Sequence, residues 1–182
     1  MDAKNIERKY TCTELLSWPE GERWELVDGM PLLMSQPTIL HEDVKMDLVR
    51  QLSVFLVGKP CRVYDAIGVK LRADEETYFV PDITVVCDKS KLADGKVCNG
   101  APDVVIEILS PTTAGIDKLE KFNKYLNSGV REYWIVDPDA AVVNVHMLDC
   151  GKYVTTAYGK ADTVPVHVLE GCMISLPDVF AG

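Results

Sequence analysis

The stretch Val104-Val105-Ile106-Glu107-Ile108-Leu109 decides how this chain folds. Apart from Glu107, all of these residues are apolar, which is typical of a β-strand that is buried on both faces. The carboxylate of Glu107 interrupts the run, and an ionised group removed from water needs a cation, a metal ion or several donors around it. A second acid, Asp82, occupies a similar place in the apolar run of residues 80–86. Two acids on two apolar strands predict a shared cation.

The segments on either side of these runs predict one mixed α/β sheet flanked by helices, in a single domain over residues 1–182. The dipeptide Asp28-Gly29 predicts a tight hairpin turn. The expected helices are 10–18, 41–57 and 117–127; the expected strands are 24–27, 31–34, 62–71, 78–87, 103–109, 132–137, 141–148 and 153–158; and residues 88–102 and 110–115 are expected loops.

The composition is that of an ordinary globular protein, with 47% hydrophobic and 26% charged residues. Its 28 acidic and 19 basic side chains give a net charge of −9. This charge argues against a broad electrostatic attraction to nucleic acid or to anionic membranes. A substrate that carries phosphate would therefore need a local cationic patch or metal ions.

The six cysteines have no Cys-x-x-Cys spacing, which disfavours a zinc or redox motif. Several lie in apolar surroundings, where a cysteine behaves as a small hydrophobe, so no disulfide framework is expected. The sequence contains no secretory signal and no long apolar segment. These features predict a cytoplasmic protein that does not enter membranes.

If the strands around residues 82 and 107 are neighbours in the sheet, the two carboxylates converge. Hard oxygen ligands of this kind are preferred by magnesium and manganese, with the remaining positions left to water and substrate. A water on such a metal is a better nucleophile, and the metal offsets charge on a phosphoryl oxygen. The pair Asp82 and Glu107 therefore predicts a Mg²⁺ or Mn²⁺ site.

The helix expected at 117–127 supplies a cation. Its buried stripe is expected to consist of Leu119, Phe122 and Leu126. Lys118, Lys121 and Tyr125 share an adjacent flank, from which a lysine can bend its ammonium toward Glu107, and the lysines at 118, 121 and 124 could form a basic edge. Such a lysine could position a water or stabilise charge on phosphate.

Structural explanations stand beside these functional ones. Asp82 follows a proline, and the carboxylate of such a pair commonly bonds the backbone of a turn. Glu107 could form a buried structural ion pair. Three further candidates are Glu25, a hairpin acid expected to be exposed, and His41 with Glu42 near the start of the long helix.

Residues 81–82, 105–111 and 129–138, together with Asp117, Lys121 and Tyr125, carry a resemblance to a known family. The chain resembles the Uma family of "putative restriction endonucleases", which is placed in the PD-(D/E)xK nuclease superfamily. This likeness implies a restriction-endonuclease-like core in which Asp82 and Glu107 bind the metal. It also implies the backbone carbonyl oxygen of Ile108 as a further ligand. Leu109 stands where the superfamily usually has its lysine, so the resemblance transfers that role to Lys121.

The leading hypothesis is a magnesium-dependent nuclease that hydrolyses phosphodiester bonds of nucleic acid. One alternative is a catalytically inactive binding or assembly protein on the same fold, a homo-oligomer with residues such as Trp134 or Phe180 at its interface. The other is a metal-dependent hydrolase of a small phosphate compound, which an acidic surface tolerates better than long DNA. A homo-oligomer is expected whichever of these functions the protein has.

Overall fold

A six-stranded mixed sheet forms the centre of the protein in the computed structural model, which describes residues 8–19, 21–71, 76–110 and 117–181. The strand order is β11-β10-β9-β8-β6-β3, and only β8 and β9 run parallel. The strands are β3 (Arg62–Asp65), β6 (Ile83–Val86), β8 (Val104–Ile108), β9 (Glu132–Asp137), β10 (Val142–Asp149) and β11 (Lys152–Gly159). Most of the predicted loop 110–115 lies outside the described residues.

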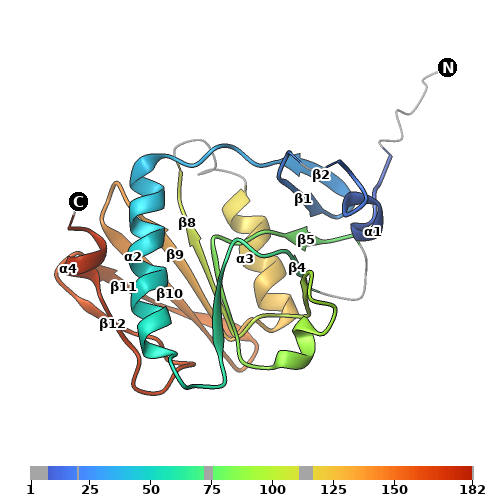
Figure 1. Ribbon diagram of the computed structural model, residues 1–182. Coiled ribbons are helices and arrows are strands. Elements are labelled where there is room, and N and C mark those ends of the chain that lie inside the picture. The colour runs from blue at the N-terminus through green and yellow to red at the C-terminus, as the bar shows by residue number, and fades with distance from the viewer. Residues whose placement is uncertain (1–7, 20, 72–75, 111–116, 182) are drawn as a thin grey trace.

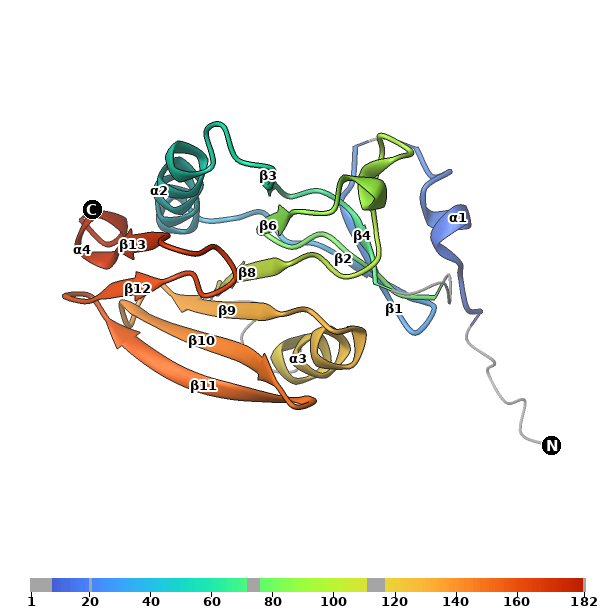
Figure 2. The same ribbon diagram turned by 90° about the horizontal axis from the view of Figure 1, so that it is seen from below.

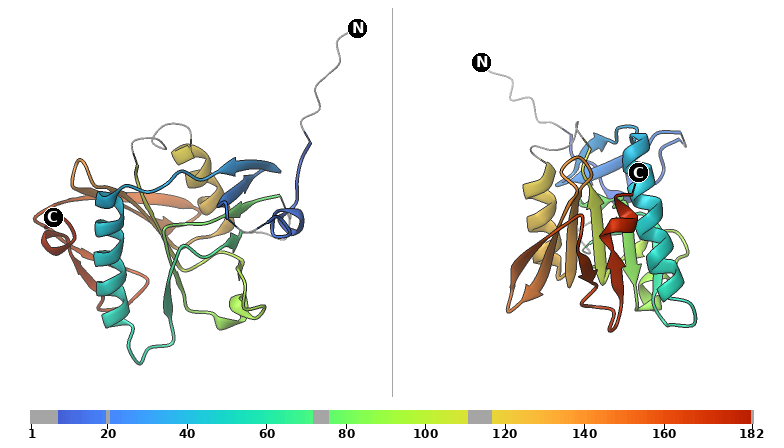
Figure 3. Two further views of the ribbon diagram at one scale, coloured as in Figure 1. Left: turned by 45° about the horizontal axis from the view of Figure 1, so that its top comes forward. Right: turned by 90° about the vertical axis from the view of Figure 1, so that its left-hand side faces the viewer.

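Helices cover both faces of this sheet, as Figure 2 and the right-hand view of Figure 3 show. Helix α2 (Ile39–Phe55) covers one face, and its inner residues Val44, Leu48 and Leu52 share a core with Ile106 of β8. Helix α3 (Asp117–Ser128) connects the parallel strands β8 and β9 and covers the opposite face, where Val105 belongs to a second core. Because side chains alternate along a strand, Glu107 shares the α3 face with Val105.

A smaller sheet with the order β2-β1-β5-β4-β7 lies beside the main one (Figure 1). Asp28 and Gly29 form the predicted turn between β1 and β2, with the positive φ angles (48° and 82°) that such a turn requires. The remaining elements are α1 (Cys12–Leu15), β1 (Trp24–Val27), β2 (Met30–Leu33), β4 (Val69–Lys70), β5 (Tyr78–Phe79), η1 (Lys89–Leu92), β7 (Cys98–Asn99), β12 (Thr163–Pro165), β13 (Met173–Ser175) and α4 (Leu176–Val179).

Two long predicted strands are each divided in two, and both breaks lie next to Asp82. The run 62–71 separates into β3 and β4 at Ala66, whose φ of 47° no regular strand adopts. The run 78–87 separates into β5 and β6 at Pro81, which has no N–H to give to a ladder. Asp82 therefore directly precedes β6 instead of lying within a strand, and its carbonyl oxygen accepts a hydrogen bond from Ala66 N at 3.0 Å.

Other boundaries also differ from the prediction. The expected helix 10–18 is shorter, because only α1 is helical, and the expected loop 88–102 contains η1 and β7. Trp134 and Phe180, proposed for an oligomer interface, are buried in the core beneath α2 and cannot form an outer surface. Among the described helices, none has the length and apolar character needed to cross a membrane.

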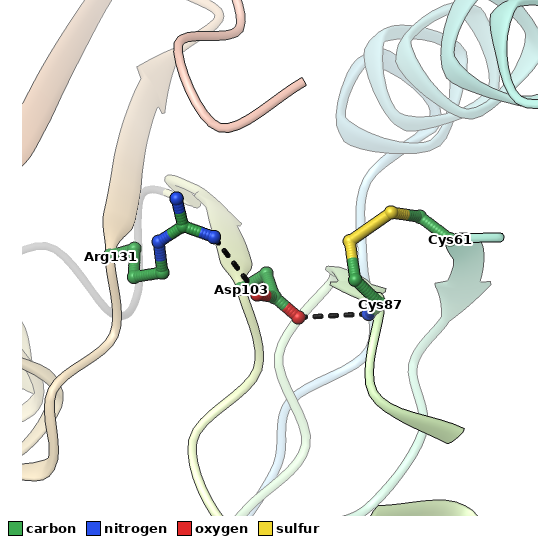
Figure 4. The surroundings of a disulfide bond; sticks show 4 residues. All are labelled: Cys61, Cys87, Asp103 and Arg131. Carbon is green, nitrogen blue, oxygen red and sulfur yellow. Dashed lines mark hydrogen bonds and ion pairs between the residues drawn. A yellow bond between two sulfur atoms is a disulfide. The ribbon is translucent and has the colours of Figure 1, made fainter. Parts of the chain in front are cut away.

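A disulfide joins Cys61 to Cys87, so the expectation of no disulfide framework needs correction at this pair (Figure 4). These cysteines flank β3 and β6, in which Arg62 pairs with Val86, and the same register places them opposite each other. Beside the bond, a carboxylate oxygen of Asp103 accepts a hydrogen bond from Cys87 N at 2.8 Å. The pairing depends on strand register, which the cysteine spacing of 26 residues does not reveal.

Candidate metal and catalytic site

Asp82 and Glu107 lie opposite each other at the end of two paired strands. Strands β6 and β8 are antiparallel neighbours in which Ile83 pairs with Ile106. One further step in this register sets residue 82 against residue 107, and residues directly opposite in an antiparallel pair point to the same side. The predicted adjacency of these two segments is confirmed, although Asp82 lies just before its strand.

Each carboxylate is held through one oxygen. Oδ2 of Asp82 accepts a hydrogen bond from Ile108 N at 2.8 Å and lies 3.2 Å from His41 Nε2. Oε1 of Glu107 accepts from Lys121 Nζ at 3.2 Å and from the Tyr125 hydroxyl at 2.7 Å. Within the described part of the chain, neither Asp82 Oδ1 nor Glu107 Oε2 takes part in a hydrogen bond or ion pair. Each acid thus retains one oxygen that a ligand could use.

A third carboxylate, that of Glu25 on β1, completes the group. Lys121 Nζ lies 2.9 Å from both oxygens of Glu25, and Val80 N donates a hydrogen bond to one of them at 2.9 Å. The hairpin acid was expected to be exposed, but Glu25 is buried, with the ammonium of Lys121 against its carboxylate. In Figure 1, α2 and α3 both begin at the upper end of the molecule, where this hairpin lies.

The buried face of α3 is only partly the predicted one: Phe122 packs against the core, as expected. Lys121 and Tyr125 point inward, whereas Leu119, expected in the buried stripe, is 68% exposed. The aromatic ring of Phe79 lies beneath Lys121, with 5.4 Å between Nζ and the ring centroid. Lys124 pairs with Asp28, so it does not contribute to an open basic edge, and the side chain of Lys118 lies outside the described residues. Lys121 therefore reaches Glu107 from the core-facing side of α3.

This arrangement leaves more negative than positive charge around Glu107. Burial raises the pKa of Glu107 to about 7; the ammonium of Lys121 opposes this change, and the charges of Asp82 and Glu25 reinforce it. Burial and the charge of Glu107 also raise the pKa of Tyr125 well above its ordinary value, so its hydroxyl remains a donor. Two further carboxylates and one ammonium acting on Glu107 form an environment that an additional cation would complement.

A second charged group adjoins Asp82. His41 is the member of this group that contacts Asp82, and Glu42 lies next to it; both were candidates from the sequence. Burial lowers the pKa of His41, but the hydrogen bond and charge of Asp82, with the charge of Glu42, outweigh burial and raise it above the ordinary value. The sequence reasoning missed Lys45 and Asp65, which continue the group. The sequence could have revealed Lys45, because it stands beside Val44 on the core-facing side of α2, where a lysine is rare unless it is paired.

The residues present fit a magnesium-like ion better than one that needs a full protein cage. Among the described residues, no three His, Cys, Asp or Glu side chains are grouped to hold a metal by themselves. Mg²⁺ commonly takes one or two carboxylates and completes its coordination with waters and substrate phosphate oxygens. The unused oxygens of Asp82 and Glu107 match that donor set. The role of the Ile108 carbonyl oxygen stays a prediction.

Known proteins resemble this chain in fold or in sequence. The crystal structure of "a putative nuclease belonging to DUF820" from Anabaena variabilis superposes with a TM-score of 0.77 at 24% identity, covering 94% of this chain and 97% of that one. This likeness confirms the expected mixed α+β fold. The uncharacterized Synechocystis sp. protein slr1290 is 26% identical over 179 residues, which span 96% of this chain and 93% of the relative. Another uncharacterized protein of that organism, sll1609, is 26% identical over 131 residues, which span 70% of this chain and 74% of the relative. The model of the Uma2 family, described as "Putative restriction endonuclease", matches residues 12–177, and the chain therefore belongs to this family.

Proposed function

We propose that this protein is a nuclease that hydrolyses phosphodiester bonds of nucleic acid, using a Mg²⁺ or Mn²⁺ ion held by Asp82 and Glu107. The observation that carries the proposal is the opposed pair of carboxylates, each with one unused oxygen, beside the ammonium of Lys121. Family membership supports the reaction class, and the raised pKa of Glu107 supports a missing positive charge at this place.

The bound cation would make a water molecule more acidic and would offset negative charge on a phosphoryl oxygen. Lys121 contributes a fixed positive charge beside the carboxylate of Glu107, where it can stabilise charge that develops on the phosphate. Glu25 holds the lysine with both of its oxygens and is itself fixed by Val80 N. The ammonium therefore needs little reorganisation, which is what electrostatic catalysis requires.

The acidic character of the protein favours a second candidate, a hydrolase of small phosphate compounds at the same site. The net charge of −9 repels long nucleic acid more than it repels a small diester. The two candidates use the same residues and differ only in the substrate. Self-association and a cytoplasmic location remain predictions.

The experiment compares substrates and variants in parallel. Purified protein is incubated with single- and double-stranded DNA, with RNA and with bis(p-nitrophenyl) phosphate, each in Mg²⁺, Mn²⁺ or EDTA. The test variants are Glu107→Gln and Asp82→Asn. Their matched controls are Glu120→Gln and Asp149→Asn, which remove the same charge from exposed positions.

We expect cleavage of nucleic acid that needs the divalent ion, falls by about 100-fold or more in both test variants, and is unchanged in both controls. Cleavage of the small diester alone would replace nucleic acid with a small phosphate substrate. Equal activity in the test and control variants would remove Asp82 and Glu107 from the site. No hydrolysis in any condition would favour the inactive binding or assembly protein.

A further inference from the structure

We propose that a chain of charged side chains on α2 and β3 aims the carboxylate of Asp82, with His41 as a positioning residue and Lys45 as its support. The inference rests on the metal site of the proposed function. It assigns a role to residues outside that site, and it explains why a lysine lies on the inner side of α2.

The α2 charge chain consists of Asp65, Lys45, Glu42 and His41, and it ends on Asp82. Asp65 Oδ1 lies 3.3 Å from Lys45 Nζ, which donates a hydrogen bond to Glu42 Oε1 at 2.8 Å. That same oxygen lies 3.5 Å from His41 Nδ1, which is an ion-pair distance and not a hydrogen bond, because Nδ1 has no hydrogen-bond partner among the described residues; His41 Nε2 lies 3.2 Å from Asp82 Oδ2. Because a carboxylate only accepts, the proton between His41 and Asp82 resides on Nε2.

The α2 charge chain and the backbone of β3 together form a ring that includes Asp82. Its far end, Asp65, is followed by Ala66, whose N–H donates to the carbonyl oxygen of Asp82 at 3.0 Å. The end of β3 therefore holds Asp82 twice, once through the backbone and once through the chain that leads to His41. The first restraint fixes the backbone of Asp82 and the second acts on its carboxylate, so the residue is held at both places.

Asp82 needs such restraints because of its place in the fold. It precedes β6 in a bend after Pro81, so no strand ladder fixes its backbone on both sides. The terminal torsion of an aspartate is broad, and its carboxylate turns easily unless donors hold it. Ile108 N–H and His41 Nε2–H both bind Oδ2, which fixes the carboxylate plane and leaves Oδ1 for a metal.

The burial of His41 and Lys45 argues that these two residues serve geometry more than stability. Their side chains are only 7% and 8% exposed, whereas those of Glu42 and Asp65 are 39% and 50% exposed. Charged groups lose hydration on burial, and replacing a buried ion pair with apolar side chains is often neutral or stabilising. Apolar residues at these positions would extend the core stripe of Val44 and Leu48. The charged residues instead connect that stripe to a metal-site carboxylate, as outer-shell partners of ligands do.

The test measures Mn²⁺ affinity of the purified full chain by electron paramagnetic resonance, together with urea stability in EDTA. The variants are His41→Leu, which removes the donor, and His41→Gln, whose amide N–H can replace Nε2–H. Lys45→Met removes the support. His167→Leu, at an exposed histidine, is the matched control.

We expect His41→Leu to weaken Mn²⁺ binding by about 10- to 100-fold, Lys45→Met to weaken it less, and His41→Gln and the control to bind close to wild type. Rescue by glutamine separates positioning from a loss of packing, because both variants remove the imidazole ring. Unchanged affinity in His41→Leu, or equal weakening in the leucine and glutamine variants, would overturn the positioning role while leaving the metal site in place. Failure of the wild-type chain to bind Mn²⁺ would instead overturn the metal site, and this inference with it.

Discussion

The substitution Glu107→Gln should make the stability of the protein less dependent on pH. In the folded chain the pKa of Glu107 is raised from 4.5 to about 7, chiefly by burial. Between these two pH values the folded state holds a proton that the unfolded state has released. The free energy of unfolding therefore falls as the pH rises: this contribution is complete below pH 4.5 and is lost once the pH passes about 7.

The size of the effect follows from the two pKa values. At 1.36 kcal/mol for each pH unit, the interval from 4.5 to about 7 corresponds to about 3 kcal/mol. The side chain of Glu107 keeps 14% of its surface exposed, so water screens part of this cost and the figure is an upper value. Between pH 5 and pH 8 we expect Glu107 alone to contribute a loss of about 2 to 3 kcal/mol. Glutamine has nearly the same shape but no titration, and it removes this loss.

The assay is urea denaturation at pH 5 and pH 8 in EDTA, followed by circular dichroism. The quantity of interest is the difference between the variant and the wild type, because titrations of groups distant from Glu107 are the same in both. With a urea slope of about 2 kcal/mol per molar, the midpoint of the variant relative to wild type should rise by about 1 M between the two pH values. Glu120→Gln, at an exposed position of α3, should show no such change.

The same pH dependence in Glu107→Gln and in wild type would refute the reasoning. It would mean that Glu107 is ionised throughout this range in the folded protein. The surplus of negative charge around it would then already be compensated, and the argument for an additional cation would lose its electrostatic support.

Three further predictions concern neighbouring features. Lys121→Met should lower the free energy of unfolding by about 3–5 kcal/mol, because it leaves two buried carboxylates without their cation; adding Glu25→Gln should restore part of the stability, measured by urea, but none of the nuclease activity. Reduction of the Cys61–Cys87 bond, which spans 26 residues, should cost about 3 kcal/mol; a denaturation midpoint unchanged by dithiothreitol, with the double serine variant as reference, would contradict this. Glu132→Ala should cost about 1–3 kcal/mol by leaving the N–H groups of Trp134 and Val168 without their acceptor; a stability equal to that of wild type would show that water replaces the carboxylate.

The parts of the fold that the sequence predicted are those that depend on local pattern. The apolar run around Glu107 became a central strand, and the apolar stripe containing Leu48 became the core-facing side of α2. The boundaries that failed depend on single residues that break a ladder, such as Ala66 and Pro81. Local periodicity does not show such breaks, because apolar residues such as Ile67 and Ile83 continue beyond each one.

The site was predictable to the extent that its residues stand out from an apolar background. Glu107 and Asp82 both did so, and the register of β6 and β8 places them opposite each other. Lys121 lies beside Glu107, as predicted, but the helix face was assigned by apolar content, which placed Leu119 inside. An ion pair with Glu25, 96 residues away, outweighs that preference. The contacts of Lys45 and the disulfide depend on how distant segments pack, which no spacing in the sequence records.

The joint binding of one divalent cation by Asp82 and Glu107 can be measured most directly by anomalous scattering from crystals soaked with Mn²⁺. We predict one strong peak about 2 Å from a carboxylate oxygen of each residue, on the side of Asp82 Oδ1 and Glu107 Oε2, and its loss in Glu107→Gln crystals. A peak that contacts only one of these acids, or persists unchanged in the variant, would contradict the proposed site.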